Sequence, residues 1–178
     1  MIRTAESYIL YIKHINPDNK LNYKEVNEKT GNSGYDIYVS EDTIIEPSLN
    51  KKEKLYTQIH SNIQCEMKKH YNEFRINNKN EIIDNKEIVE SCGFLLLSRS
   101  SLSNLGLSMP HSVGLIDSSY RGEILGRVFS FNKENIVIKK NDRLFQIVAP
   151  DLSEFTVKFV NELSNTTRGS GGFGSTTL

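Results

Sequence analysis

Short apolar runs separated by polar stretches dominate this chain. Most of them are too short for helices, and several alternate apolar with polar side chains. Runs of this length and spacing are typical of β-strands. The pattern therefore predicts an all-β fold, of the barrel or jelly-roll type. The runs with this character are residues 8–12, 94–97, 136–138, 144–148 and 155–159.

One short helical turn interrupts the strand pattern at residues 101–105. Ser100 can cap its start, because a serine hydroxyl accepts hydrogen bonds from free helix N–H groups, and Gly106 can end it. Residues 27–34 form a polar connection that ends in turn-forming residues. We expect a helix of only a few residues, placed at a functional corner.

Residues 68–90 differ from the rest by being rich in asparagine, lysine and glutamate, with small apolar islands at 82–83 and 88–89. Such a stretch indicates a surface insertion, either a hairpin or a partly disordered loop. A chain of 178 residues suffices for one core. We therefore expect a single domain over residues 1–167, which carries this insertion, followed by a tail at 168–178.

Composition excludes several classes of function. Lysine and arginine together number 22, as do aspartate and glutamate, so no overall basic field would hold nucleic acid or an anionic membrane. No run approaches the roughly 18 apolar residues that span a bilayer. The start has no basic segment followed by an apolar stretch. We expect a soluble intracellular protein of the cytoplasm or nucleus.

Cysteine and histidine usage argues against a metal held by protein side chains. Cys65 and Cys92 are the only cysteines, and the four histidines are scattered without a His-Glu-x-x-His or Cys-x-x-Cys spacing. Zinc enzymes depend on such spacings. We expect two reduced thiols that serve packing, each at the start of a strand, rather than a disulfide or a zinc site.

The tail, residues 168–178, is rich in glycine and hydroxyl groups and has almost nothing that could build a core. Its composition fits a flexible end, but its contents also suit a nucleotide. Arg168 can fork onto phosphate oxygens, glycine amides can approach an anion closely, and Phe173 can stack on a base.

Two further stretches carry chemistry. In residues 98–102 Arg99 is followed by two hydroxyls at the entrance to the helical turn, which makes a sensible phosphate cradle. In residues 114–123 Asp117 closes an apolar strand, and the following turn aims Tyr120 toward the same side. Asp117 could deprotonate a water or merely cap the turn.

Five stretches, in this order, resemble the five sequence motifs of the trimeric deoxyuridine triphosphate nucleotidohydrolases, the dUTPases. Outside the insertion, the resemblance covers most of the chain from about Tyr8 onward. The third and fifth motifs are long and specific. The stretches are residues 33–38 (Ser-Gly-Tyr-Asp-Ile-Tyr), 99–102 (Arg-Ser-Ser-Leu), 114–122 (Gly-Leu-Ile-Asp-Ser-Ser-Tyr-Arg-Gly), 141–147 (Asn-Asp-Arg-Leu-Phe-Gln-Ile) and 168–176 (Arg-Gly-Ser-Gly-Gly-Phe-Gly-Ser-Thr).

The resemblance implies a jelly-roll-like β barrel with the dUTPase β-clip fold, assembled as a homotrimer whose active sites are shared between subunits. The flexible tail would act as a lid over a neighbour's site. The implied activity is hydrolysis of dUTP to dUMP and pyrophosphate, which limits uracil incorporation into DNA and supplies dUMP for thymidylate synthesis.

Carried over to this chain, the resemblance makes Asp117 the base that activates the attacking water. Tyr120 would lie under the deoxyribose and leave no room for a 2′-hydroxyl. The other implied substrate contacts are Arg99, Ser100, Ser101, Arg143, Gln146 and Arg168 for the phosphates, His111, Gly114, Leu115, Ile116 and Leu125 for the uracil pocket, and Phe173, Gly174, Ser175 and Thr176 for the lid.

Magnesium is the implied cofactor, chelated by the three phosphates and water rather than by protein ligands, as suits an ion that keeps its waters. Asp36 would act on it through a water, or would be a structural carboxylate in a turn. The chain also departs from the family pattern. Asn141 replaces a turn glycine, which asparagine tolerates at positive φ, and Phe145 stands where a small residue is common.

Two alternatives stay open at this point, and a third is excluded. The stretch 99–107 also resembles the phosphate loop of dCTP deaminases, although Arg127 occupies the place of their catalytic glutamate. Because Glu123 lies nearby, an enzyme with both deaminase and dUTPase activity remains an alternative. A non-catalytic, regulatory nucleotide-binding trimer would be expected to lack Asp117 or the tail, and this chain has both. A P-loop is excluded, because residues 169–176 lack its lysine and a following helix.

The tail generates a first prediction. Deletion of residues 168–178 should leave a folded trimer whose turnover of dUTP is greatly reduced, because a segment without core residues contributes binding groups rather than stability. Size-exclusion chromatography and a pyrophosphate-release assay on the truncated chain test it. An unchanged rate would contradict the role of the tail.

Overall fold

The computed structural model describes residues 2–4, 6–19, 21–50 and 54–171, and nearly all of its regular structure is β-strand. The strands are β1 (Ile2–Arg3), β2 (Ser7–His14), β3 (Gly34–Tyr38), β4 (Thr43–Ile45), β5 (Thr57–Ile76), β6 (Ile82–Cys92), β7 (Phe94–Ser98), β8 (Leu107–Ser108), β9 (Gly114–Ile116), β10 (Glu123–Ser130), β11 (Ile136–Ile138), β12 (Arg143–Val148) and β13 (Phe155–Phe159). The all-β prediction is confirmed.

The expected closed barrel is not found in the described residues. Their strands form three separate sheets of seven, two and four strands. The largest runs in the order β13-β2-β5-β10-β8, with β1 and β6 also on β5; the smaller sheets are β11-β4 and β3-β12-β7-β9. A barrel requires its first and last strands to pair. Here the end strands β13 and β8 pair with no second neighbour in the described chain.

Strand β5 organises the largest sheet. Its 20 residues correspond to about 66 Å of extended chain. Successive parts of it pair antiparallel with β10, β2, β6 and β1. The sequence pattern did not predict this strand, because its buried positions are interrupted by lysine, histidine, asparagine and glutamate.

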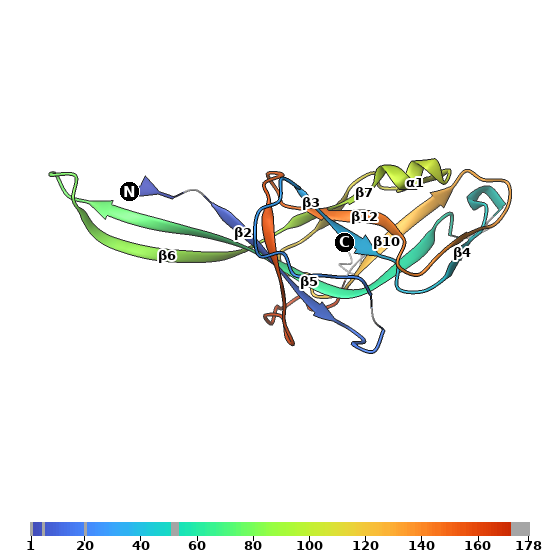
Figure 1. Cartoon of the computed structure of the whole chain (residues 1–178), viewed down its shortest axis with the longest axis horizontal. Helices are drawn as coiled ribbons and strands as arrows, with labels where there is room; N and C mark the ends of the chain where they lie inside the picture. Colours follow the sequence, from blue (N-terminus) through green and yellow to red (C-terminus); the bar gives the residue numbers. More distant parts are fainter. Residues whose placement is uncertain (1, 5, 20, 51–53, 172–178) are drawn as a thin grey trace.

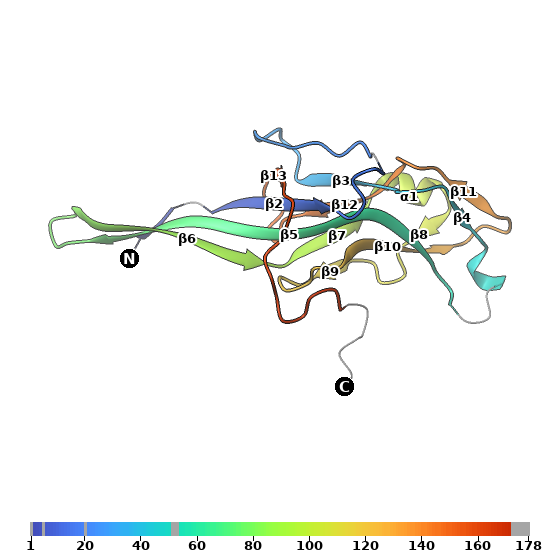
Figure 2. The ribbon, with the colours of Figure 1, turned by 90° about the horizontal axis from the view of Figure 1, so that it is seen from below.

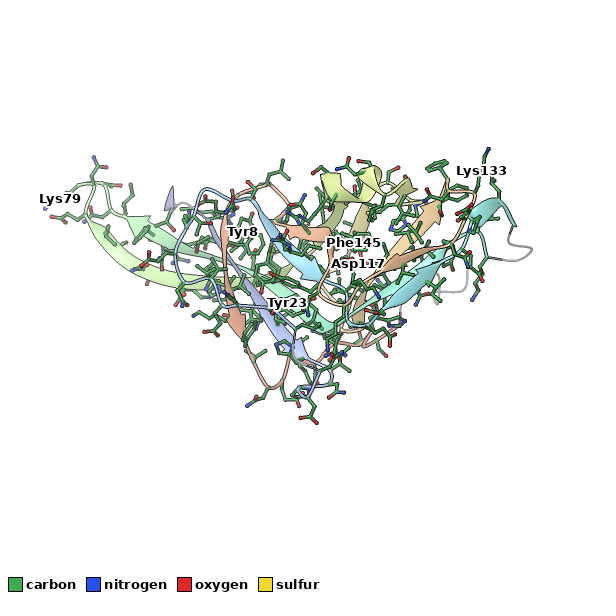
Figure 3. All side chains as sticks on the ribbon, turned by 45° about the vertical axis from the view of Figure 1, so that its right-hand side comes forward. Tyr8, Tyr23, Lys79, Asp117, Lys133 and Phe145 are labelled. Carbon is green, nitrogen blue, oxygen red and sulfur yellow. The ribbon has the colours of Figure 1, made fainter. Side chains whose placement is uncertain are left out.

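The stretch 68–90 is the outer part of a hairpin made by β5 and β6, which projects away from the body (Figure 1). Of the two structures expected for this stretch, the hairpin is therefore confirmed. Nearly every side chain of β6 is exposed, which explains why the strand lacks the apolar alternation of a half-buried one. Its tip, at Lys79, lies far from the centre of the molecule, where Asp117 and Phe145 are found (Figure 3).

The core lies between the largest sheet and the four-stranded sheet, and one contact in it explains a departure from the family pattern. Phe145 on β12 is 2% exposed. The position facing its ring is Gly126 on β10, where any β-carbon would overlap the ring. The larger side chain at 145 is therefore accommodated by the smallest possible residue at 126.

The helix α1 (Ser100–Asn104) and two turn positions agree with the prediction from the sequence, except for the residue that caps the helix N-terminus. The N-cap is Arg99 rather than Ser100, and no side chain hydrogen-bonds the free N–H groups there. Arg99 keeps the extended backbone conformation of the preceding strand, and Ser100 is the first residue with helical backbone. Gly106 ends the helix with φ +67°, and Asn141 has φ +71°, as expected. A 3-10 turn, η1, spans Ser48–Asn50.

The two cysteines are free, and their places in the strands differ from the expectation. Cys65 lies in the middle of β5 and Cys92 at the end of β6, rather than at strand starts. Burial raises the pKa of both thiols, that of Cys92 to about 11. Among the described residues, the helices are also too short and too polar to cross a bilayer.

The fit of Phe145 against Gly126 gives a second prediction. Gly126→Ala should lower the free energy of unfolding by about 1–3 kcal/mol, because overpacking forces a buried ring off its preferred position. The same substitution in a Phe145→Leu background should cost less. Urea unfolding of the wild type, both single variants and the double variant tests it. Equal costs in the two backgrounds would contradict the proposed contact.

Candidate active site

Three of the motif stretches meet on the four-stranded sheet. Strand β12 lies between β3 and β7, so the motif residues on these three strands become neighbours. Asp36 of β3 stands opposite Gln146 of β12, and Arg99 directly follows β7. Residues more than a hundred positions apart in the chain are thus brought together by strand pairing alone.

Asp36 holds two arginines in what we call the arginine cluster, comprising Asp36, Arg99 and Arg143. Its Oδ1 lies 2.9 Å from Arg99 Nε, and its Oδ2 lies 3.1 Å from Arg143 Nη1. Ser101 Oγ donates to the Arg143 carbonyl at 2.9 Å. All three charged side chains are at least a quarter exposed. With two cations and one anion, the cluster retains a net positive charge that suits phosphate.

The arginine cluster borders a large open hollow of about 600 Å³, lined also by the loop before β3 and by Gln146. Gln146 Nε2 donates to the Ser98 carbonyl at 3.4 Å. Ser100 is exposed at the start of α1, beside Arg99 in a neighbouring hollow. The residues expected to bind phosphate therefore gather on one side of the molecule, with Arg168 as the exception.

A second cavity, which we call the Asp117 pocket, has a volume of about 200 Å³. It contains the expected uracil-binding and catalytic residues together. Its lining residues are Leu96, His111, Gly114, Leu115, Ile116, Asp117, Tyr120, Glu123, Leu125 and Arg168. Asp117 follows the short strand β9, and the Tyr120 amide donates to its carbonyl at 3.0 Å, which closes the turn that brings the two side chains to one pocket.

Two titratable side chains in the walls of the Asp117 pocket, Tyr120 and His111, have pKa values shifted toward their neutral forms. Burial, together with the Glu123 carboxylate, raises the pKa of Tyr120, whose hydroxyl donates to the Glu123 carbonyl at 2.8 Å. Burial, with Arg127 nearby, lowers the pKa of His111 below 6.5, which favours the uncharged ring. Together with Leu96, Leu115 and Leu125, these two side chains form a part of the wall that suits an uncharged ring more than an ion.

Three acidic or basic side chains also line the pocket, namely Asp117, Glu123 and Arg168, and Glu123 is fixed by neighbouring groups. Its Oε1 accepts hydrogen bonds from the amides of Ser61 and Asn62 at 3.0 and 2.8 Å. Its Oε2 lies 2.9 Å from His60 Nδ1. A carboxylate bound by two backbone amides and a histidine is held in place as part of the pocket wall.

Strand β7 separates the arginine cluster from Asp117. Arg99 follows the last residue of β7, whereas Asp117 follows Ile116, which pairs with Phe94, the first residue of β7. Asp117 is therefore level with Gly93, because a β-carbon added there would lie 3.9 Å from Asp117 Cα. The five residues of β7 lie between Gly93 and Arg99, and the six residue steps from one to the other span about 20 Å.

The segment that leads into the tail runs close to β9 (Figure 2), and it is hydrogen-bonded to the loop that carries Tyr120. The Arg121 amide donates to the Gly169 carbonyl at 2.8 Å, and Thr166 Oγ1 donates to the Ser119 carbonyl at 2.6 Å. Arg168 pairs with Asp117 of the same chain, and its guanidinium lies 5.8 Å from the centre of the Tyr120 ring.

A buried ion pair supports this segment. Arg121 Nη2 lies 2.8 Å from Glu66 Oε2, with side chains only 9% and 4% exposed. Both partners also bind Ser164: the Arg121 Nε donates to its carbonyl at 2.9 Å, and its hydroxyl donates to Glu66. The Arg121 guanidinium additionally donates to the carbonyls of Ser118 and Tyr120.

Comparison with known proteins assigns the family. A family model described as dUTPase matches residues 85–177, which are 93 of the 178 residues. The chain belongs to the dUTPase family. The match includes four of the five motif stretches, and the first, residues 33–38, precedes it.

Curated dUTPases match less than half of the chain. The deoxyuridine 5'-triphosphate nucleotidohydrolase of Anaplasma marginale is 42% identical over 80 residues, which cover 44% of this chain and 54% of that protein. The enzyme of the same name from Mus musculus is 41% identical over 75 residues, covering 40% and 46%. The chain thus spans about half the length of the curated relatives it matches.

Solved dUTPase structures have a similar fold. The dUTPase from Streptococcus mutans has a TM-score of 0.50 at 20% identity, covering 77% of this chain and 91% of that one. A variant dUTPase of phage phi11 of S. aureus, in which a structural Mg(II) ion is coordinated, has a TM-score of 0.50 at 17% identity, covering 78% and 88%.

The structure places most of the site residues expected from the dUTPase motifs in two groups. Arg99, Arg143 and Gln146 lie with Asp36, which is on a strand rather than in a turn. His111, Gly114, Leu115, Ile116, Tyr120 and Leu125 lie with Asp117. Arg168 was expected on a neighbour, and it contacts Asp117 of its own chain. Phe173, Gly174, Ser175 and Thr176 lie outside the described residues.

The motifs did not point to Glu66 and Ser164, which support the site from outside. Arg121 is inside the third motif, but its charge gave no indication of a partner. No local signal marks Glu66, which is itself buried although it lies between Cys65 and Met67, whose buried side chains point to the other face of the strand. Buried carboxylates are rare unless they are paired.

The Arg121–Glu66 pair generates a third prediction. Burial alone would raise the pKa of Glu66, but hydrogen bonds from Ser164 and the charges of Lys68 and Arg121 outweigh it and lower the pKa below the ordinary 4.5. Its contribution to stability is therefore present above pH 4.5 and is lost as the pH falls through the lowered value.

Glu66→Gln should accordingly lower the free energy of unfolding at pH 7 by about 3–5 kcal/mol, because Arg121 would be left buried without its counter-charge. The difference from wild type should shrink below pH 4.5. Glu162→Gln, which breaks the exposed pair with Lys13, is the matched control and should cost less than about 1 kcal/mol. Urea unfolding from pH 3 to pH 7 measures both; a constant difference would contradict the assignment.

Proposed function

We propose that this protein hydrolyses dUTP to dUMP and pyrophosphate. The observation that carries the proposal is the Asp117 pocket, in which the Asp117 carboxylate and the Tyr120 ring border a cavity of about 200 Å³ whose walls include Leu96, Leu115, Ile116 and Leu125. The curated relatives named deoxyuridine 5'-triphosphate nucleotidohydrolase support the choice of substrate. A neutral pyrimidine fits the cavity, and Asp117 stands at its edge.

In this mechanism Asp117 takes a proton from a water molecule as that water attacks the α-phosphorus. The bond between the α-phosphorus and the bridging oxygen breaks, and pyrophosphate leaves with the electron pair. Asp117 is half-exposed, so a water can reach it. A general base supplies roughly 10²–10⁴-fold, whereas enzymes commonly exceed about 10⁶. The rest must come from positioning and charge stabilisation by the cations and hydroxyls.

The arginine cluster can serve this reaction only from another chain. Within one chain, β7 keeps Arg99 and Asp117 about 20 Å apart, whereas a triphosphate under attack at its α-phosphorus needs the base and the phosphate ligands close together. We therefore propose a homotrimer in which Asp117 of one subunit and the arginine cluster of a neighbour complete a shared site. The exposed arginine cluster and the exposed Leu115 beside the pocket are compatible with this arrangement.

Magnesium fits this site as an ion held by substrate oxygens and water. No group of three histidine, cysteine, aspartate or glutamate side chains in the described part of the chain could cage a metal. Asp36, the carboxylate of the arginine cluster, has both oxygens paired with arginines. When bound, the ion would neutralise phosphate charge, while Asp36 would contact its water shell at most.

A pyrophosphate-release assay with dUTP, dCTP, dTTP and UTP, with and without magnesium, tests the proposal. Rapid release from dUTP alone supports it. Equal release from dUTP and dCTP would overturn the specificity. Ammonia release from dCTP would instead indicate a deaminase, although Glu123 is engaged by Ser61, Asn62 and His60 in the pocket wall.

The fourth prediction concerns the base. Asp117→Asn should keep the fold and the binding of a non-hydrolysable dUTP analogue while turnover falls by at least about 100-fold, because the amide cannot accept the proton. Calorimetric titration and the pyrophosphate assay measure the two effects. A variant that retains more than about a tenth of the wild-type rate would contradict the assignment.

A further inference from the structure

Strand β5 carries an irregularity beside the Asp117 pocket. Three of its residues, 61–63, stand opposite the single residue Ile124 of β10. The extra residues form a β-bulge, in which Asn62 has φ +61°. Amides in a bulge lose their regular partners on the neighbouring strand, and here Ser61 and Asn62 are both buried. Buried amides need another acceptor, because leaving them unpaired is costly.

The side chain of Glu123 supplies that acceptor. Its Oε1 accepts from the amides of Ser61 and Asn62 at 3.0 and 2.8 Å, and its Oε2 lies 2.9 Å from His60 Nδ1. Ser61 Oγ also donates to the carbonyl of Ile124, the next residue of β10, at 2.5 Å. Hydrogen bonds to a carboxylate are stronger than those to a neutral acceptor. We call Glu123, His60, Ser61 and Asn62 the Glu123 clamp.

The clamp is fixed to the rest of the protein on its far side. Asn62 Oδ1 accepts from the Asn16 amide at 3.0 Å, and Asn62 Nδ2 donates to the Asn16 carbonyl at 2.8 Å. The Asn62 carbonyl accepts from the Ile15 amide at 3.0 Å. The segment that follows β2 thus holds the bulge, and the bulge holds Glu123. The position of Glu123 is therefore set from outside the pocket.

The ring of Tyr120 is attached to the pocket side of the clamp. Its hydroxyl donates to the Glu123 carbonyl at 2.8 Å. The ring lies against Gly122, where any β-carbon would overlap it. Gln64 Nε2 donates to the Arg121 carbonyl at 2.7 Å, which ties the same loop to β5. A ring fastened to a clamped residue has little freedom to move, so its place in the pocket depends on the Glu123 carboxylate.

The base is held independently of the clamp. Asp117 follows β9, which pairs with β7 and not with β5 or β10. Loss of the clamp should therefore displace the Tyr120 ring and leave Asp117 in place. Both carboxylate oxygens of Glu123 are already engaged by the other members of the clamp. Glu123 is thus suited to position a neighbour rather than to exchange protons with a substrate.

We propose that Glu123 is a positioning residue for the Tyr120 ring, and that the Glu123 clamp thereby sets the selectivity of the pocket for deoxyribose over ribose. A ring packed on the sugar can exclude a 2′-hydroxyl only while the ring cannot retreat. The inference rests on the proposed function, with the Tyr120 ring under the sugar as the dUTPase resemblance implies. It adds that a carboxylate held by the neighbouring strand controls this contact.

Steady-state kinetics with dUTP and UTP test the inference. Glu123→Ala should raise the KM for dUTP about tenfold while kcat stays within about threefold of wild type, because a binding contact is lost and the base is kept. The ratio of kcat/KM for dUTP to that for UTP should fall about tenfold. Glu123→Gln keeps an oxygen for the two amides and should restore both quantities. Unchanged KM and selectivity in a folded Glu123→Ala would overturn the proposal.

Glu25→Ala is the matched control. Glu25 Oε1 accepts from the Phe159 amide at 2.9 Å, so this variant also removes a contact between a glutamate and a backbone amide. Neither residue lines the Asp117 pocket. The variant should keep the KM and the selectivity of wild type. A loss of selectivity as large as that of Glu123→Ala would attribute the effect to general loosening and contradict the positioning role.

Tyr120→Phe removes the link between the ring and Glu123 and leaves the clamp intact. It should lower the selectivity by itself, and adding Glu123→Ala should lower it little further, because both changes act on one ring. Fully additive effects would show that Glu123 does not act through Tyr120. Glu123→Asp, which keeps the charge but is one methylene shorter, replaces Glu123→Ala in this cycle if the alanine variant does not fold.

Amide hydrogen exchange tests the clamp without substrate. Residues 61–62 should exchange at least about tenfold faster in Glu123→Ala than in wild type or Glu123→Gln. Equal exchange would overturn the clamp. Selective hydrolysis of dUTP by wild type, with the same selectivity in Glu123→Ala, would overturn the inference alone. A wild-type chain without dUTP hydrolysis would refute the proposed function and the selectivity with it, and exchange would still decide whether the clamp holds.

Discussion

The site depends on the buried ion pair between Glu66 and Arg121. Removing two charges from water is expensive, and such a pair is tolerated only when further hydrogen bonds satisfy the remaining donors and acceptors. Here Ser164 and the carbonyls of Ser118 and Tyr120 supply them. The pair thereby connects the longest strand, the loop that follows Asp117, and the segment that leads into the tail. Three segments far apart in sequence are fixed relative to one another at the pocket.

The second constraint is the length of β7. Five residues of strand separate the arginine cluster from the pocket, and a strand cannot be shortened by a change of side chains. The chain therefore presents two groups of side chains at opposite ends of one strand. One group is the exposed arginine cluster, and the other is the Asp117 pocket, which apolar, aromatic and ionisable side chains line together. The proposal that a neighbouring chain completes the site rests on this separation rather than on any property of the individual residues.

Departures from the dUTPase pattern are compensated locally. Asn141 takes the left-handed backbone conformation that a glycine would adopt, and its side chain accepts a hydrogen bond from the Asn22 amide. Phe145 fills space that Gly126 leaves open. Both changes leave Asp36, Arg143 and Gln146 in register on β3 and β12. The residues at positions 141 and 145 thus differ from the family pattern, while Asp36, Arg143 and Gln146 remain on neighbouring paired strands.

The sequence by itself determined the elements whose signals are local: the alternating strands, the helix that ends at Gly106, the turn at Asn141, and the residue types of the motifs. Neighbouring side chains and backbone preferences are enough to specify these. Only the tertiary structure decided which groups meet. The sequence pattern did not reveal strand β5, because the partners that cover its polar residues lie elsewhere in the chain. Glu66 finds Arg121 and Ser164 across 55 and 98 residues. Such pairings depend on the whole packed fold, and no local pattern encodes them.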